Sequence, residues 1–283
     1  MKENNFLEYL KLLELFFSKE NKEDIFEKFC SELMQTGVNV SRDCIKYNVE
    51  PHVYNQEMIN LYSKSDAFIY ELLVSSLKKE TIKKDNFIIK RINEYFDVEN
   101  KINILCFGDG VGSNSIKLAK LGYSVTYFDI EGKISSFAAL NFKLNKVDNL
   151  IQTIFNDSNL LQNSFDVVIC REVLEHLEDP IDNVKKLRSY LKNNGLCFIS
   201  ESFSSVNENF PTHLSSNLKY ANITHDLIVR AGFNFFETYN STNLDVFKKT
   251  DSTNNSRFSS IPKKSFILRI KKKIRDKIIY LLS

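Results

Sequence analysis

A short apolar run, a glycine-rich turn and an amphipathic segment follow one another between residues 102 and 121. Residues 102–107 read Ile-Asn-Ile-Leu-Cys-Phe, which is typical of a strand buried on both faces. Gly108, Gly110 and Gly112 come next, and residues 113–121 carry apolar side chains at helical spacing. Glycine permits the sharp turn and lets a ligand approach the backbone, while the amides at the start of the helix favour an anionic group. The segment therefore predicts the nucleotide-binding corner of a doubly wound α/β sheet.

The spacing of the glycines indicates which nucleotide this corner binds. A dinucleotide fingerprint would place its third glycine at position 113, where this chain has Ser113. The third glycine is instead Gly112, one residue earlier. A Gly-x-Gly-x-Gly turn after a buried strand resembles motif I of the class I S-adenosylmethionine-dependent methyltransferases. The resemblance implies that the start of the helix receives the carboxylate of the cofactor's methionine part.

The order of the segments after the turn resembles the same family over residues 100–240. A second apolar strand at 123–128 leads to Asp129, about 20 residues after the turn, where an acid that binds ribose hydroxyls is expected. A carboxylate in this place is also suited to cap a helix. Further strands are predicted at 149–155, 165–170, 196–200 and 233–239. The segment Phe-Asp-Val-Val-Ile-Cys-Arg-Glu-Val-Leu-Glu-His-Leu-Glu-Asp-Pro that begins at residue 165 is the most specific match after motif I.

The resemblance implies a set of cofactor contacts. They are Gly108, Asp109, Gly110 and Gly112 at the methionine part, Asp129 and Ile130 at the ribose, Asp157 and Ser158 at the adenine, and Arg171 beneath the cofactor. One departure concerns the acid that the family usually has two residues before the first glycine, because this chain has Cys106 there. A thiol cannot anchor a ligand as a carboxylate does, so we expect Asp109 to take over part of that role.

A carboxylate–histidine cluster follows the predicted strand at 165–170. Glu172, Glu175 and His176 stand at i, i+3 and i+4, so a helical turn would bring them to one face. Two carboxylates and an imidazole can hold a divalent cation, which lowers the pKa of a bound hydroxyl. The arrangement resembles the metal site of the small-RNA 2′-O-methyltransferases and of the ubiquinone-pathway O-methyltransferases, with His213 as a fourth ligand.

A reading without a metal fits the same cluster. The carboxylates and the imidazole would then orient the start of a helix and touch the cofactor. An acceptor hydroxyl still has to lose its proton during methyl transfer. In that case His176 or His213 becomes the catalytic general base.

Residues 1–99 are predicted to form a helical extension that precedes the cofactor-binding domain. Apolar side chains recur at helical spacing, and the pattern over 58–77 predicts one long helix. In the family that the chain resembles, such an extension often covers the cofactor and shapes the acceptor pocket. Tyr54 and Tyr62 are candidates to close over the cofactor, and packing is the alternative role for both. A packing element or a contact between two subunits of a homodimer fits the pattern equally well.

The cofactor-binding domain is predicted to span residues 100–270. Residues 240–260, rich in Ser, Thr and Asn, predict a loop, and 265–270 predict the antiparallel seventh strand of the family's sheet. Residues 271–283 predict a basic amphipathic helix, and from 261 to 283 eight Lys or Arg stand against one Asp. Such a tail suits weak contact with an anionic membrane surface, packing on the sheet, or packing on a second subunit.

The composition of the chain argues against several classes of protein. No apolar stretch reaches the roughly 20 residues that span a bilayer, the first residues lack a signal-peptide core, and the five cysteines include no Cys-x-x-Cys pair. These features favour a reducing cytoplasm. A net charge of +2 predicts no general affinity for nucleic acid.

We therefore expect an α/β protein with a doubly wound, mostly parallel seven-stranded sheet and an N-terminal helical extension. The expected function is a cytoplasmic S-adenosylmethionine-dependent methyltransferase acting on oxygen, rather than nitrogen, of a small or medium-sized molecule, with a divalent metal ion as a candidate second cofactor. Three alternatives stay open: an RNA methyltransferase, a nicotinamide-dependent oxidoreductase, which Ser113 disfavours, and a non-catalytic scaffold, which Cys106 would suit.

Overall fold

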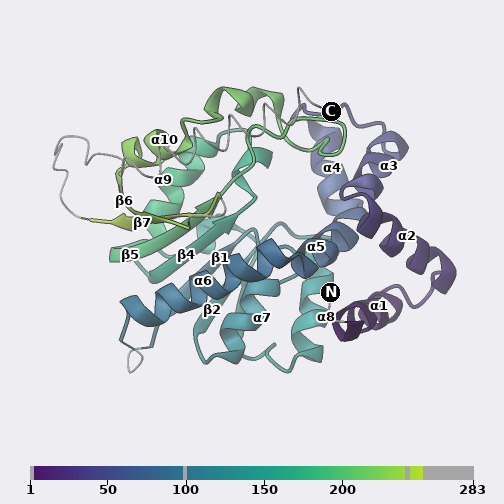
Figure 1. Cartoon of the computed structure of the whole chain (residues 1–283), viewed down its shortest axis with the longest axis horizontal. Helices are drawn as coiled ribbons and strands as arrows, with labels where there is room; N and C mark the ends of the chain where they lie inside the picture. The colour runs from purple at the N-terminus through teal and green to yellow at the C-terminus, as the bar shows by residue number, and fades with distance from the viewer. Residues whose placement is uncertain (1–2, 98–100, 240–242, 251–283) are drawn as a thin grey trace.

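A seven-stranded sheet forms the centre of the computed structural model, which describes residues 3–97, 101–239 and 243–250. The strand order is β3-β2-β1-β4-β5-β7-β6, and every pairing is parallel except those of β7 (Figure 1). The predicted fold class is confirmed. The strands are β1 Asn103–Phe107, β2 Ser124–Phe128, β3 Ile151–Ile154, β4 Phe165–Arg171, β5 Leu191–Ser200, β6 Phe233–Thr238 and β7 Asp245–Lys249.

Helices cover both faces of this sheet because successive strand residues point to opposite sides. Ile104 and Cys106 of β1 pack into one core with α6, α7 and α8, whereas Leu105 and Phe107 pack into another with α9 and α10. Both faces of the central strands are therefore apolar, which explains the continuous apolar runs in the sequence. The helices of these layers are α6 Lys79–Tyr95, α7 Ser113–Lys120, α8 Lys133–Leu144, α9 Pro180–Tyr190 and α10 Thr224–Arg230.

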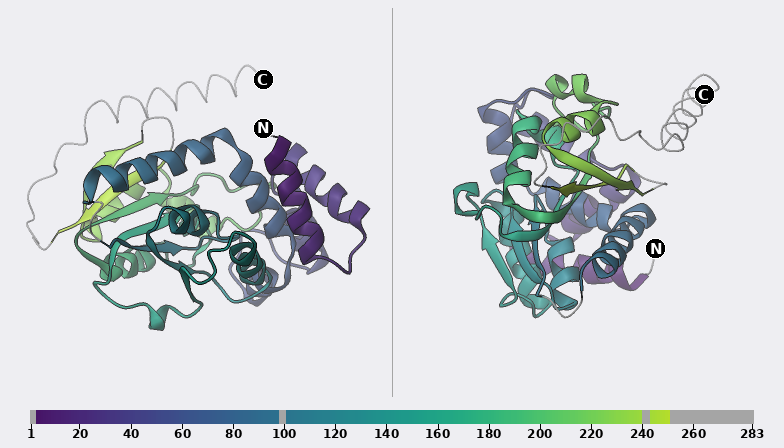
Figure 2. Two further views of the ribbon diagram at one scale, coloured as in Figure 1. Left: turned by 90° about the horizontal axis from the view of Figure 1, so that it is seen from below. Right: turned by 90° about the vertical axis from the view of Figure 1, so that its left-hand side faces the viewer.

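The remaining N-terminal helices build a third core beyond the carboxyl ends of the strands. They are α1 Glu3–Phe16, α2 Lys22–Met34, α3 Val38–Lys46, α4 Gln56–Lys64 and α5 Ala67–Leu77. Their buried side chains pack together with Val111 of the glycine turn and with Ile134 and Phe137 of α8. Helices α1 to α3 gather at one end of the molecule, and α6 runs along the sheet (Figures 1 and 2). The extension thus closes over the edge of the sheet where the cofactor turn lies.

The helix predicted over 58–77 is two helices. The chain breaks at Ser65, whose hydroxyl accepts a hydrogen bond from the backbone N–H of Ala67 at 3.0 Å and donates one to Asp43 at 2.6 Å. A serine hydroxyl that satisfies free amides at a helix start is a common stop and start signal. The break lets α4 and α5 take different directions, so that each presents side chains to a different part of the site.

The seventh strand is β7, Asp245–Lys249, between β5 and β6. The expectation of a loop over 240–260 is therefore wrong at these residues. Val246 and Phe247 are fully buried on opposite faces, and β7 is hydrogen-bonded on both sides. Pairing with two existing strands decides the conformation here, and local composition does not. Residues 265–270 and the basic tail lie outside the described residues.

Within the described ranges, no helix has both the length and the apolar content needed to cross a membrane. The longest helix near the sheet, α6, carries charged residues along much of its length. Its apolar stripe instead packs on the sheet through Ile88 and Ile92.

Candidate active site

The glycine turn between β1 and α7 can be built only from glycine at its centre. Gly110 and Gly112 have backbone φ angles of 54° and 79°, in the left-handed region that other residues resist. A Cβ atom at Gly110 would overlap the side chain of Leu72 on α5, and one at Gly112 would overlap Phe142 on α8. Leu72 of the N-terminal extension therefore lies directly on the turn.

The carboxylate of Asp109 is bound to the start of α7, so its expected role as a ligand anchor in place of Cys106 stays a prediction. One of its oxygens accepts hydrogen bonds from the backbone N–H and the side-chain amide of Asn114, at 3.1 and 2.8 Å. The other accepts from the N–H and the hydroxyl of Ser115, at 2.8 and 2.7 Å. Burial raises the pKa of Asp109, and these donors oppose the rise. The first amides of α7, which the resemblance assigned to the methionine carboxylate, are thus already used by the chain's own carboxylate.

Asp129 directly follows β2 and reaches the same turn. Its oxygens accept hydrogen bonds from the N–H of Gly110 at 2.7 Å and of Ile130 at 2.8 Å. Burial raises the pKa of Asp129 to about 6. Next to it, Ile130 is 45% exposed. The structure thus places Asp129 and Ile130 beside the glycines, where the prediction needs them.

Asp157 and Ser158 lie apart from the turn contacts. They belong to the short 3₁₀ helix η1, Asp157–Asn159, which follows β3. The carboxylate of Asp157 pairs with Lys186 of α9 at 2.7 Å, and both side chains are largely exposed. Ser158 donates its backbone N–H to the side chain of Asn156. A role at the adenine therefore stays a prediction for these two residues.

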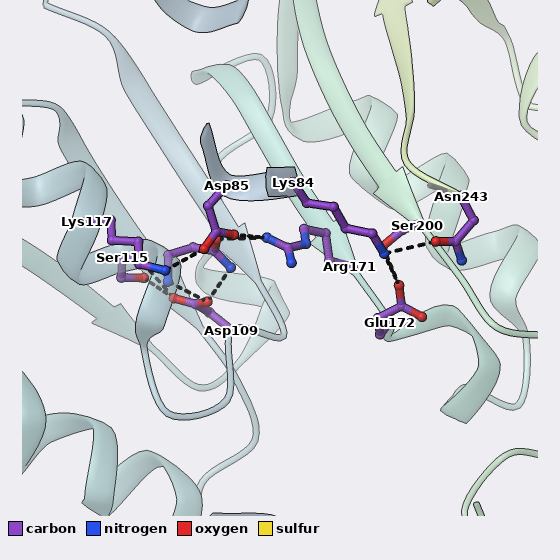
Figure 3. A network of polar contacts seen from close by, with 10 residues as sticks. Lys84, Asp85, Asp109, Ser115, Lys117, Arg171, Glu172, Ser200 and Asn243 are labelled. Carbon is purple, nitrogen blue, oxygen red and sulfur yellow. Dashed lines mark hydrogen bonds and ion pairs between the residues drawn. The ribbon is translucent and has the colours of Figure 1, made fainter. Parts of the chain in front are cut away.

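Arg171 ends β4 on the face of the sheet that α6 and α7 cover. Its guanidinium forms an ion pair with Asp85 of α6 and donates to the side chain of Asn114 at 3.2 Å (Figure 3). Asp85 also pairs with Lys117 of α7. The buried Nε atom of Arg171 has no hydrogen-bond partner among the described residues. Arg171 is therefore fixed next to the start of α7, close to the glycine turn.

Three of the four predicted metal-binding residues come together at the carboxyl end of β4. The ligand atoms of Glu175, His176 and His213 all lie within 4.8 Å of one another. Glu175 is 1% exposed, and neither of its carboxylate oxygens has a hydrogen-bond partner in the described part of the chain. Burial and the nearby charge of Glu172 raise the pKa of Glu175 well above its ordinary value. An unpaired buried carboxyl group is costly, so this carboxyl group is a candidate to contact a ligand.

The segment that carries this cluster is not the expected helical turn. Residues Leu174–His176 form the 3₁₀ helix η2, and Glu172 has a φ angle of 52°. Glu172 is not part of the group of three residues whose ligand atoms lie within 4.8 Å of one another. Its carboxylate accepts hydrogen bonds from Ser200 at 2.8 Å and Ser202 at 2.5 Å, and it pairs with Lys84 at 3.1 Å. Its partial burial opposes ionisation, but Lys84 and the two hydroxyls together lower the pKa of Glu172 to about 2.

Backbone contacts orient the two imidazoles. Nδ1 of His176 lies 3.1 Å from the carbonyl oxygen of Thr212 and 2.9 Å from the hydroxyl of Tyr62. Because a carbonyl oxygen only accepts hydrogen bonds, Nδ1 carries the hydrogen and Nε2 keeps a free lone pair. Burial lowers the pKa of His176 to about 4, and burial with the neighbouring His176 lowers that of His213 to about 3. Both rings are therefore neutral at physiological pH and suited to bind a cation.

The N-terminal extension holds the loop that carries His213. His52 donates its backbone N–H to the carbonyl of Pro211 at 2.7 Å and accepts at its own carbonyl from Ser215 at 3.0 Å. Its imidazole contacts the carbonyl oxygen of His213 at 2.9 Å. Tyr62 belongs to the same extension, so the cluster combines residues from α4, from η2 and from the loop after β5.

Sequence patterns alone missed two residues of this region, Lys84 and Asp85. Both are buried in α6 and contact the predicted site residues Glu172 and Arg171 (Figure 3). Lys84 stands four residues before Ile88, on the stripe that packs on the sheet. A charged residue on an apolar helical stripe was therefore the available signal.

The fold and the glycine turn define a class I, S-adenosylmethionine-dependent methyltransferase. A model of a methyltransferase-domain family matches residues 81–241, more than half of the 283 residues. The chain belongs to this family. The matched segment begins inside α6, so it includes Lys84 and Asp85.

Curated relatives resemble part of the chain. A ubiquinone biosynthesis O-methyltransferase from Rickettsia felis is 33% identical over 119 residues, which are 40% of this chain and 47% of that protein. The enzyme of the same name from Colwellia psychrerythraea is 33% identical over 124 residues, 43% of this chain and 47% of that protein. The chain therefore spans about half the length of these relatives.

A solved structure supports the architecture over a larger share of the chain. A candidate O-methyltransferase from Nostoc punctiforme superposes with a TM-score of 0.51 at 14% identity, covering 78% of this chain and 71% of that one. At this identity the likeness shows the fold alone. It extends the agreement beyond the sheet, because 78% of the chain is more than the family match covers.

Proposed function

We propose that this protein transfers the methyl group of S-adenosylmethionine to a hydroxyl oxygen of a small or medium-sized molecule, with a divalent cation at Glu175, His176 and His213. The observation that carries the proposal is the unpaired buried carboxyl group of Glu175 beside two neutral imidazoles. The names of the curated relatives, which are O-methyltransferases, support oxygen as the acceptor atom.

The residues at the cluster fit a divalent cation. A carboxylate and two imidazoles suit zinc, manganese, iron and similar ions, and the backbone contact at Nδ1 of His176 leaves its Nε2 free. The buried Nδ1 of His213 also has no hydrogen-bond partner among the described residues. When bound, the cation would act as a Lewis acid that lowers the pKa of the acceptor hydroxyl.

The pKa directions favour this chemistry over a histidine base. A general base works best when its pKa lies near the working pH. Burial holds the pKa of His176 at about 4 and that of His213 at about 3, so either ring would be a weak proton acceptor. We infer that the protein promotes proton loss by lowering the pKa of the acceptor hydroxyl, and that neither His176 nor His213 acts as a general base.

The remaining residues would position the cofactor. Asp129 would accept hydrogen bonds from the ribose hydroxyls, and the glycine turn would lie along the methionine part. Asp109 holds the start of α7 in place, so the turn is organised before the cofactor binds. Leu72 and Tyr62 of the extension would close the space between cofactor and acceptor, which excludes water from the transfer.

The proposal is tested by calorimetric titration of the protein with S-adenosylhomocysteine, with Mn²⁺ present and after chelation, followed by a methylation assay on catechol. Catechol offers two adjacent oxygens, which a single cation can bind together. We expect cofactor binding in both conditions and methyl transfer only with the cation. Methyl transfer that survives complete chelation would overturn the metal role, and a lack of cofactor binding would overturn the function.

Cofactor binding is expected to weaken about ten-fold when the pH is lowered from about 7.5 to about 5. Burial raises the pKa of Asp129 to about 6, so the carboxylate that accepts the ribose hydrogen bonds is mostly ionised at the higher pH and mostly protonated at the lower. Calorimetry with S-adenosylhomocysteine across this range measures the effect. In the Asp129→Asn variant, binding should be weak throughout and nearly independent of pH. A wild-type affinity that does not change with pH would argue against the ribose assignment.

A further inference from the structure

Lys84 occupies an unusual position for a lysine. It is 7% exposed and lies on the α6 stripe that faces the sheet. Its ammonium group contacts the carboxylate of Glu172 at 3.1 Å and the side-chain oxygen of Asn243 at 2.9 Å (Figure 3). A buried lysine needs such partners to remain charged. The ion pair therefore holds Lys84 on Glu172, beside the proposed metal site.

Glu172 and Glu175 differ sharply in their surroundings, although they are only three positions apart in the chain. Glu172 accepts hydrogen bonds from two serine hydroxyls in addition to the ion pair with Lys84. Its backbone N–H donates to the carbonyl of Ser200 at 2.9 Å, which fixes the residue at the end of β4. The two carboxyl oxygens of Glu175 accept no hydrogen bond from a donor among the described residues, and they lie near the charge of Glu172. One carboxylate is therefore satisfied within the protein, and the other is left for a ligand.

We propose that Lys84 sequesters Glu172, so that a cation at this site takes Glu175, His176 and His213 as its protein ligands and leaves its other positions to acceptor oxygens. This inference rests on the proposed metal-assisted function. Catalytic metal sites commonly have three protein ligands and at least one open position. The charges agree with this use, because a divalent cation on one carboxylate and two neutral imidazoles keeps a net charge of about +1. That charge favours an ionised acceptor oxygen.

The decisive variant removes the Lys84–Glu172 pair without changing the net charge. In Lys84→Met/Glu172→Gln, we expect the Kd for Co²⁺ to stay within about three-fold of the wild type and the visible absorption spectrum of bound Co²⁺ to be unchanged. If Glu172 is a ligand, this variant should instead bind Co²⁺ more than ten-fold more weakly, with an altered spectrum, and the proposal is then wrong. Because both charges are removed together, neither is left buried and unpaired.

The single variant Lys84→Met tests the sequestering itself. Releasing Glu172 beside the site is expected to tighten Co²⁺ binding at least ten-fold and to change the absorption spectrum, because a further carboxylate becomes available as a ligand. Lys117→Met is the matched control, since it removes a nearby positive charge that pairs with Asp85 and not with Glu172. The control should change the Kd by less than about three-fold and leave the spectrum unchanged. An unchanged spectrum in Lys84→Met would contradict the proposal.

Failure of this inference can be told apart from failure of the proposed function. Wild-type protein that binds S-adenosylhomocysteine but no Co²⁺ would overturn the metal role and this inference together. Wild-type protein that binds Co²⁺ and loses it in the double variant would overturn only the role of Lys84. Circular dichroism of each variant shows whether it is folded, and the double variant decides the matter even where Lys84→Met does not fold.

Discussion

Replacement of Glu175 by glutamine is expected to stabilise the metal-free protein and to abolish its stabilisation by divalent cations. Glu175 is 1% exposed, and both of its oxygens are unpaired among the described residues. Glutamine has nearly the same shape but carries no charge, so the cost of burying an ionisable group falls, by roughly 1–3 kcal/mol. The gain in melting temperature of the metal-free variant at neutral pH, measured by calorimetry, checks this expectation.

The pH dependence of the stability of the metal-free protein provides a second test of the role of Glu175. The pKa of Glu175 is raised in the folded protein, so above the ordinary glutamate pKa the unfolded chain releases a proton that the folded chain retains. The stability of the metal-free wild type should therefore fall as the pH rises from about 4.5 upward, until the raised pKa is passed. The contribution of residue 175 to this slope should vanish in Glu175→Gln.

A matched control is Glu32→Gln. Glu32 is also fully buried, but its carboxylate accepts hydrogen bonds from the backbone and side chain of Asn39 and from the N–H of Gly37. The same substitution there should lower the melting temperature, because it breaks contacts that already exist. If Glu175→Gln also lowers the melting temperature, or if the variant is still stabilised by Mn²⁺ as strongly as the wild type, Glu175 is not the metal ligand.

Replacement of Asp85 by alanine is expected to destabilise the protein by about 3–5 kcal/mol, because it leaves a buried guanidinium without its counter-charge. Asp85 is 5% exposed and pairs with Arg171, whose side chain is 11% exposed, as well as with Lys117. Urea unfolding monitored by circular dichroism measures the loss. Cofactor affinity should fall as well, because Arg171 at the end of β4 holds Asn114 at the start of α7.

Two further variants test whether the loss of stability in Asp85→Ala comes from the unpaired guanidinium of Arg171 or from replacing any paired aspartate by alanine. Asp85→Ala/Arg171→Met removes both members of the pair and should recover part of the lost stability. Asp182→Ala breaks an exposed pair with Lys185 and should leave the midpoint of urea unfolding nearly unchanged, because solvent screens that pair. An Asp85→Ala variant as stable as Asp182→Ala would mean that the ion pair with Arg171 contributes little.

The adjacent residues Lys84 and Asp85 connect α6 to two parts of the site. Asp85 contacts Arg171 at the start of α7, and Lys84 contacts Glu172 beside the histidine cluster (Figure 3). Arg171 and Glu172 are themselves adjacent in the chain. A displacement of α6 would therefore disturb the cofactor side and the acceptor side together.

Patterns local in sequence determined the class of protein. The apolar run of β1, the alternating glycines and the acid after β2 lie within about 30 residues, and they fix a strand, a turn and a helix by short-range sterics and burial. The sequence also marked Glu175, His176 and His213, which the fold brings within 4.8 Å of one another. The helical extension was visible as well, because its apolar spacing is periodic.

Only the tertiary structure decided the partners of those residues. Glu172 meets Lys84 from 88 positions away, and Arg171 meets Asp85 from 86 positions away. The strand β7 forms because two neighbouring strands accept it, and Asp109 rather than a ligand satisfies the first amides of α7. Periodicity and composition report which face of an element is buried. They do not report which distant charge lies opposite, since that depends on how the chain packs as a whole.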